Sequence, residues 1–157
     1  MIRRIISGGQ TGVDRGALDA ARTAGIACGG WCPKGRRAED GRIPDVYPLE
    51  ETERTDYAER TERNVLCSDA TLILSPSNRL AGGTALTKQF AERHNKPVLV
   101  VELDEKPNPN PVIQWLRDSS IEILNVAGPR ESFRPGIAEQ AKIFVSSVLA
   151  APGLAEK

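Results

Sequence analysis

Short apolar runs alternate with segments of helical periodicity along most of the chain. The β-branched run from Ile2 to Ser7 ends at Gly8 and Gly9, which predicts a buried strand. After Gly12 the apolar residues recur at helical spacing until Gly25, so we expect a helix there. The first unit of the chain is therefore a strand, a glycine turn and a helix.

The alternation continues toward the C-terminus. Further strands are expected at residues 26–31, 70–74, 98–103 and 121–126, and further helices at residues 56–66, 85–94, 111–116 and 136–149. Short apolar strands that alternate with helices form parallel sheets with both faces covered. The expected fold class is α/β, a Rossmann-like doubly wound parallel sheet with helices on both faces. We expect residues 1–150 to form a single ligand-binding domain and residues 151–157 to be a frayed tail.

One long segment interrupts this pattern. Residues 33–54 contain few large apolar side chains, and connections of this length in a small domain are usually functional or disordered. We expect residues 35–46 to be more mobile than the sheet when the site is empty, because little apolar surface would hold them down.

Composition and charge exclude several classes of protein. The 157 residues include 21 basic and 21 acidic side chains, so the chain has no global field for nucleic acid or an anionic membrane. Any anion site must therefore be local. No apolar run is long enough to span a membrane, and the first apolar residues end too early for a signal peptide, which predicts a cytoplasmic protein. The cysteines Cys28, Cys32 and Cys67 are odd in number and lack a second close pair, so we interpret them as thiols and predict no metal site.

Two glycine turns follow predicted strands and begin predicted helices. In an open parallel sheet, ligands bind beyond the carboxyl ends of the strands, where helix N-termini also point. Glycine lets the backbone approach an anion, and the free N–H groups of a first helical turn carry about half a positive charge. We therefore predict a phosphate or oxyanion site. Its predicted ligand-binding residues are Ser7, Gly8, Gly9, Gln10, Thr11, Gly12, Lys34, Ser75, Gly82, Gly83, Thr84 and Thr87.

Several other chemistries fit these residues poorly. A dinucleotide site would have glycine where Ser7 stands and an acidic residue at the end of the second strand, where Trp31-Cys32-Pro33 stands. Neither turn continues into the Gly-Lys-Ser/Thr of a P-loop. The single histidine, His94, lies within a predicted helix without a nucleophile to serve, so a catalytic triad is not expected.

Some side chains keep two interpretations. Trp31 and Tyr47 either stack on a flat heterocycle or pack against the core. Arg130 and Ser132 either contact an anion or help the following helix to begin.

The first glycine turn and the segment after the second strand resemble the molybdenum cofactor carrier proteins. The matching stretches are residues 7–17, 30–41, 57–69, 82–84 and 125–132, so the resemblance covers nearly the whole chain. It implies a Rossmann-like fold related to the lysine-decarboxylase-like phosphoribohydrolases and a homo-oligomer, a dimer or tetramer. It also implies protective binding of the molybdenum cofactor, a pterin with a dithiolene and a terminal phosphate, and molybdenum enzymes as recipients.

Our first hypothesis is a carrier without catalytic residues. The two glycine turns would bind the phosphate and the oxyanionic metal end of the cofactor, assisted by the hydroxyl groups of Thr11, Thr84 and Thr87. Molybdate or another oxyanion is a simpler ligand that would suit the same donors.

The rival hypotheses are a nucleoside-monophosphate phosphoribohydrolase and a nucleotide-sensing module. The related hydrolases follow the second glycine turn with a further Gly-Thr and a catalytic Glu, whereas residues 85–89 here read Ala-Leu-Thr-Lys-Gln. Hydrolysis would therefore need another carboxylate near the ribose, from Asp14, Asp69 or Glu92.

Overall fold

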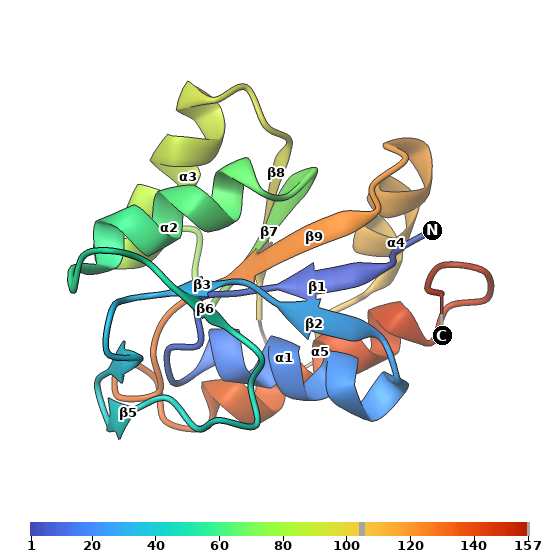
Figure 1. Cartoon of the computed structure of the whole chain (residues 1–157). Helices are drawn as coiled ribbons and strands as arrows, with labels where there is room; N and C mark the ends of the chain where they lie inside the picture. The colour runs from blue at the N-terminus through green and yellow to red at the C-terminus, as the bar shows by residue number, and fades with distance from the viewer. Residues whose placement is uncertain (104–105, 157) are drawn as a thin grey trace.

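The computed structural model describes residues 1–103 and 106–156 and shows a parallel sheet between two layers of helices (Figure 1). Its strands lie in the order β2-β1-β9-β7-β8, all parallel. They are β1 (Arg4–Ile6), β2 (Ala27–Gly29), β7 (Ala70–Ser75), β8 (Val98–Glu102) and β9 (Ile123–Ala127). The predicted α/β class and five-stranded parallel sheet are confirmed.

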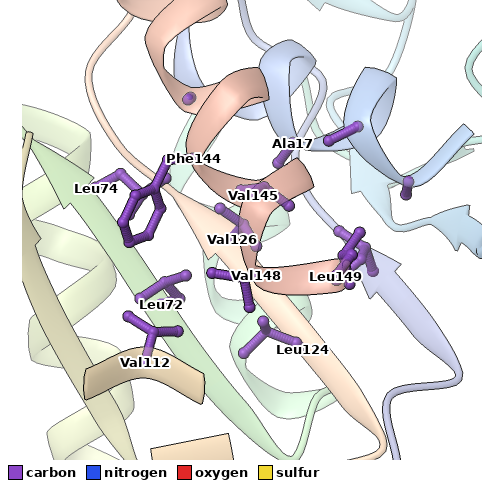
Figure 2. Packing of buried hydrophobic residues seen from close by; sticks show 14 of the residues in the cluster. Ala17, Leu72, Leu74, Val112, Leu124, Val126, Phe144, Val145, Val148 and Leu149 are labelled. Carbon is purple, nitrogen blue, oxygen red and sulfur yellow. The ribbon is translucent and has the colours of Figure 1, made fainter. Parts of the chain in front are cut away.

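Helices cover both faces of this sheet. They are α1 (Val13–Ala24), α2 (Tyr57–Leu66), α3 (Gly82–Arg93), α4 (Asn110–Asp118) and α5 (Ile137–Leu149). Helices α1, α4 and α5 pack on one face, and Figure 2 shows side chains of α5 over Leu72, Leu124 and Val126 of the sheet. Helices α2 and α3 pack on the other face, where Val65 and Phe90 belong to a smaller cluster. None of the helices in the described residues is both long and apolar enough to cross a membrane.

The interior position of strand β7 in the sheet explains why its sequence is a nearly continuous apolar run. All of its residues are buried, because helices cover the sheet on both sides. Leu72 and Leu74 belong to the larger core with α5, whereas Ile73, the residue between them, points to the opposite face.

Two expected element boundaries are wrong. The second strand ends at Gly29, because Gly30 has a φ of 127° that interrupts extended backbone. The next pair of residues forms β3 (Trp31–Cys32), which pairs with β6 (Glu50–Glu51) outside the main sheet. The helix expected from residue 85 begins at Gly82, so the second glycine turn is itself the first turn of α3.

The expectation that little apolar surface holds residues 35–46 is also wrong. The segment forms a hairpin of β4 (Arg37–Ala38) and β5 (Gly41–Arg42). Beyond the hairpin, Ile43 is fully buried in a cluster with Leu18 of α1. A buried arginine, Arg36, completes the packing by donating hydrogen bonds to the carbonyls of Ile43, Pro44, Tyr47 and Leu49. The physical reason for expecting a mobile loop is therefore absent.

The C-terminal residues, which the sequence predicts to be a frayed tail, contact the N-terminal segment as far as Glu156. Leu154 is buried, Ile2 donates a backbone hydrogen bond to Leu154 at 2.7 Å, and Glu156 donates one to Ile2 at 2.8 Å. The buried side chain of Leu154 and the backbone hydrogen bonds hold these residues against the N-terminal segment. Lys157 lies outside the described residues. The two ends of the chain therefore lie side by side (Figure 1).

Candidate functional site

A cavity of about 220 Å³ opens at the carboxyl ends of β1, β7 and β9. The turns after these strands line it, together with residues of α2 and α3. Strand β1 leads into α1 on one face of the sheet, whereas β7 leads into α3 on the other. The cavity therefore lies where the connections diverge, which is where doubly wound sheets bind ligands.

Seven of the twelve predicted ligand-binding residues line this cavity: Gly8, Gln10, Ser75, Gly82, Gly83, Thr84 and Thr87. The two predicted glycine turns thus face one cavity. The periodicity of the sequence predicts that each turn follows a strand, and the parallel sheet brings the ends of those strands together.

Two residues of the first turn lie behind the cavity wall. The Ser7 hydroxyl is buried and donates a hydrogen bond to the Val126 carbonyl at 2.7 Å, which links β1 to β9. Gly9 has a φ of 77°, and its α-carbon lies against Ile43 and Leu49 of the long loop. Both residues support the turn from within the protein.

Three other predicted residues also lie outside the cavity lining. The Thr11 hydroxyl contacts the Glu39 carboxylate and accepts a hydrogen bond from the Glu131 backbone at 3.2 Å. Gly12 lies against the backbone of residues 129–131, where a side chain would not fit. Lys34 is exposed in the long loop, and its backbone N–H donates to the Arg54 carbonyl at 3.0 Å.

The N-terminus of α3 presents free backbone donors to the cavity. Its N-cap, Ala81, has no capping hydrogen bond from a side chain among the described residues, and the first turn contains no acidic residue. The first backbone hydrogen bond of the helix joins the Ala85 N–H to the Ala81 carbonyl at 3.3 Å, so the N–H groups of residues 82–84 have no partner within the helix. A β-carbon on Gly83 would meet no described atom within 4 Å. This helix end can accept an anion closely.

Arg60 of α2 is the main cavity residue that the sequence analysis missed. Its side chain is buried, and its Nη1 donates to Asp14 Oδ2 of α1 at 3.2 Å. Its Nε has no hydrogen-bond partner in the described part of the chain. The guanidinium occupies the space that a β-carbon on Gly8 would need, so the missing side chain of Gly8 admits Arg60 into the cavity wall.

Gln10 provides a second buried donor. Its Oε1 accepts hydrogen bonds from the backbone N–H groups of Thr11 at 3.1 Å and Glu39 at 2.9 Å, which identifies the other end of the amide as Nε2. That Nε2 finds no partner within residues 1–103 and 106–156, although Gln10 is only 5% exposed. An unsatisfied buried donor costs about 1–3 kcal/mol, so two such donors on residues that line one cavity favour a ligand rich in acceptor oxygens.

The lining of the cavity is positively charged although the whole chain is neutral. Arg60, Arg79 and Arg130 line it, and Asp14 is the single acidic residue among the lining residues of the described chain. Burial raises the pKa of Asp14, whereas the Arg60 guanidinium and the Gln10 N–H oppose that rise. The cavity is thus a local basic site of the kind that a chain without net charge requires for anion binding.

Of the two aromatic residues with two interpretations, Tyr47 packs in the core, whereas the half-buried Trp31 contacts Arg63. The Arg63 guanidinium lies 4.6 Å from the centre of the Trp31 ring, and Tyr47 donates a hydrogen bond to Asp19 at 2.9 Å. Burial and this hydrogen bond raise the pKa of Tyr47 to about 12. Neither ring lines the cavity, whereas Phe133 does.

Of the three carboxylates that hydrolysis would need, Asp14 alone lines the cavity. Asp69 precedes β7 at the amino ends of the strands, away from the cavity, where it accepts hydrogen bonds from the N–H groups of Glu122 and Ile123. Glu92 lies in the last turns of α3, 3.8 Å from Lys88. Cys28, Cys32 and Cys67 are free thiols, and the described residues contain no cluster of three or more side chains that could hold a metal ion.

Comparisons with known proteins place this geometry in a family. A comparison with curated proteins found no match. The crystal structure of a protein from Syntrophus aciditrophicus SB, whose proposed role is that of a molybdenum carrier, is 45% identical and covers 96% of each chain with a TM-score of 0.87. The sequence model of the circularly permutated YpsA SLOG family matches residues 5–149. These matches confirm the family resemblance found in the sequence, and the chain belongs to the circularly permutated YpsA SLOG family.

Proposed function

We propose that the protein is a non-enzymatic carrier that binds the molybdenum cofactor in this cavity. The cofactor has a terminal phosphate and an oxyanionic metal end, and both offer several acceptor oxygens. Charge-assisted hydrogen bonds to such oxygens are about twice as strong as neutral ones. The proposed role of the Syntrophus protein as a molybdenum carrier supports this assignment.

The observation that carries the proposal is the pair of unpartnered buried donors, Arg60 Nε and Gln10 Nε2. The residues that carry them, Arg60 and Gln10, line the same cavity as the first turn of α3. An anion in this cavity would receive hydrogen bonds from a guanidinium, an amide and a helix N-terminus. The seven predicted ligand-binding residues that line the cavity, together with Arg60, form the proposed binding site.

The hydrolase alternative needs a carboxylate that is free to act on a ribose. Asp14 is the candidate that lines the cavity, but its carboxylate receives hydrogen bonds from Arg60 and from the Gln10 backbone. These contacts suit a positioning role for Asp14, which holds the Arg60 guanidinium in place. We therefore favour binding without turnover.

Two measurements on the protein purified from its own host test the proposal. Mass spectrometry of the small molecules that it releases should detect a pterin phosphate. Incubation with AMP and related nucleotides should release no free base. Sustained release of base would contradict the carrier proposal, and tight binding of a nucleotide without cleavage, in place of a pterin, would support a nucleotide-sensing module instead.

The finer parts of the proposal rest on the ligand chemistry, the sequence and the family resemblance. Molybdate is a simpler oxyanion that should compete for the same donors. Molybdenum enzymes would be the recipients of the cofactor, and the carrier would act as a cytoplasmic homo-oligomer, a dimer or tetramer.

A further inference from the structure

An exposed aromatic side chain lies at the mouth of the cavity. Phe133 lines the cavity, yet 63% of its surface is exposed. It belongs to the turn of residues 128–136, which joins β9 to α5. A bare anion gains no favourable contact from such an apolar surface, whereas a flat ring attached to the anion would stack on it.

The turn that carries Phe133 is held from both sides. The Ser132 hydroxyl and backbone N–H donate hydrogen bonds to the Glu39 carboxylate at 2.5 and 3.2 Å. The Glu131 carboxylate accepts hydrogen bonds from the N–H groups of Gly136 and Ala138. Phe133 itself donates a backbone hydrogen bond to the Arg130 carbonyl at 3.1 Å. Phe133 is therefore exposed on a fixed backbone, and little ordering entropy opposes its contact with a ligand.

Arg130, a cationic residue in the same turn as Phe133, contacts other side chains. The Arg130 guanidinium lies 5.5 Å from the centre of the Tyr57 ring and 3.8 Å from the Glu39 carboxylate. Among the described residues, no cation–π contact involves the Phe133 ring. The ring of Phe133 is thus available at the mouth, whereas Arg60 and Gln10, which also line the cavity, are buried.

We propose that Phe133 contacts the flat heterocycle of a ligand whose anionic end is bound inside the cavity. This inference rests on the proposed function and deepens it, because it assigns an orientation: the anionic end inside, the heterocycle at the mouth. Phe133 is then the residue that distinguishes a pterin phosphate from a bare oxyanion.

The test compares two probes on purified protein by titration calorimetry. The probes are molybdate, which has no ring, and a pterin monophosphate. Replacing a stacking aromatic residue by alanine usually costs enough affinity for about a tenfold rise in Kd. Phe133→Ala should therefore weaken binding of the pterin monophosphate about tenfold and leave molybdate binding unchanged. Phe133→Tyr should restore the pterin affinity.

A matched control is Ile143→Ala on α5, which removes a side chain of similar exposure, 59%, outside the cavity lining. It should change neither affinity. Equal affinities of wild type and Phe133→Ala for the pterin monophosphate would overturn the inference, as would an equal loss for both probes. A changed oligomeric state of Phe133→Ala in size-exclusion chromatography, with unchanged affinities, would assign the ring to a subunit contact. If the wild-type protein binds neither probe, the proposed function itself fails.

Discussion

The contact between Gly8 and Arg60 joins residues that are distant in the sequence and decides the chemistry of the cavity. A side chain at Gly8 would collide with the Arg60 guanidinium, which then has to move away from Asp14. Arg60 is buried and paired with the buried Asp14, so its displacement also weakens this ion pair. Gly8→Ala should therefore affect both binding and folding.

We expect Gly8→Ala to weaken molybdate binding at least about tenfold, because a charge-assisted hydrogen bond contributes about 1.5–3 kcal/mol. The free energy of unfolding should also fall, by about 1–3 kcal/mol, because the buried Asp14 carboxylate loses a hydrogen-bond partner. Titration calorimetry and urea unfolding measure the two quantities. A large loss of stability with unchanged molybdate affinity would show that Gly8 serves the fold alone.

At the scale of single residues, the sequence analysis predicted the glycines of the cavity and missed the Arg60 side chain. Glycine turns at strand ends have a local signature, so Gly8 and Gly83 could be found from their neighbours. Arg60 lies in a helix whose residues 59–63 read Glu-Arg-Thr-Glu-Arg, which is typical of a solvated charged face. Its partner Asp14 is 46 residues away, and only the tertiary structure brings the two together.

Among the elements, the long loop departs most from its expected behaviour. Its sequence contains few large apolar residues, but Ile43 is buried in a cluster with Leu18, and Arg36 is buried beside it. The Arg36 guanidinium donates hydrogen bonds to four backbone carbonyls, so polar contacts fix the loop together with the buried Ile43. Local patterns of apolar residues cannot reveal this kind of support.

We expect Arg36→Met to destabilise the protein by about 2 kcal/mol or more, because it leaves several buried carbonyls without donors. Hydrogen exchange at residues 35–46 should be slow in the wild type and fast in the variant. The control is Arg42→Met in the same loop, whose exposed pair with Asp45 should contribute less than about 1 kcal/mol. Fast exchange of this loop in the unliganded wild type would contradict the account.

In the whole molecule, the order of the strands accounts for the position of the cavity and for the contact between the N-terminus and the C-terminus. The strands can be renumbered from β7, with the count continuing from the C-terminus to the neighbouring N-terminus. The sheet β8-β7-β9-β1-β2 then has the order 2-1-3-4-5 of a flavodoxin-like doubly wound fold. In that reading β7 is the first strand, and the turn of Gly82 and Gly83 follows it. Pairing of Ile2 with Ala155 closes the connection from α5 to β1. The description of the family as circularly permutated agrees with this arrangement.

Alternation of strands and helices was sufficient to predict the class of the fold. The strand order depends on which strands pair across the sheet, and periodicity does not encode that pairing. The C-terminal contact was missed for the same reason, since Leu154 is a single apolar residue in a tail of small and polar ones.

The central claim is that an anion binds between the first turn of α3 and Arg60, and substitution of Gly83 tests it most directly. A β-carbon there has open space, so Gly83→Val should leave the melting temperature nearly unchanged while its side chain excludes an anion from the backbone donors. We expect molybdate binding to lose about 2 kcal/mol or more, a rise in Kd of about thirtyfold. Gln140→Val, in the exposed first turns of α5, is the control for a β-branched residue in a helix and should bind molybdate as the wild type does. Equal molybdate affinity of Gly83→Val and wild type would contradict the account.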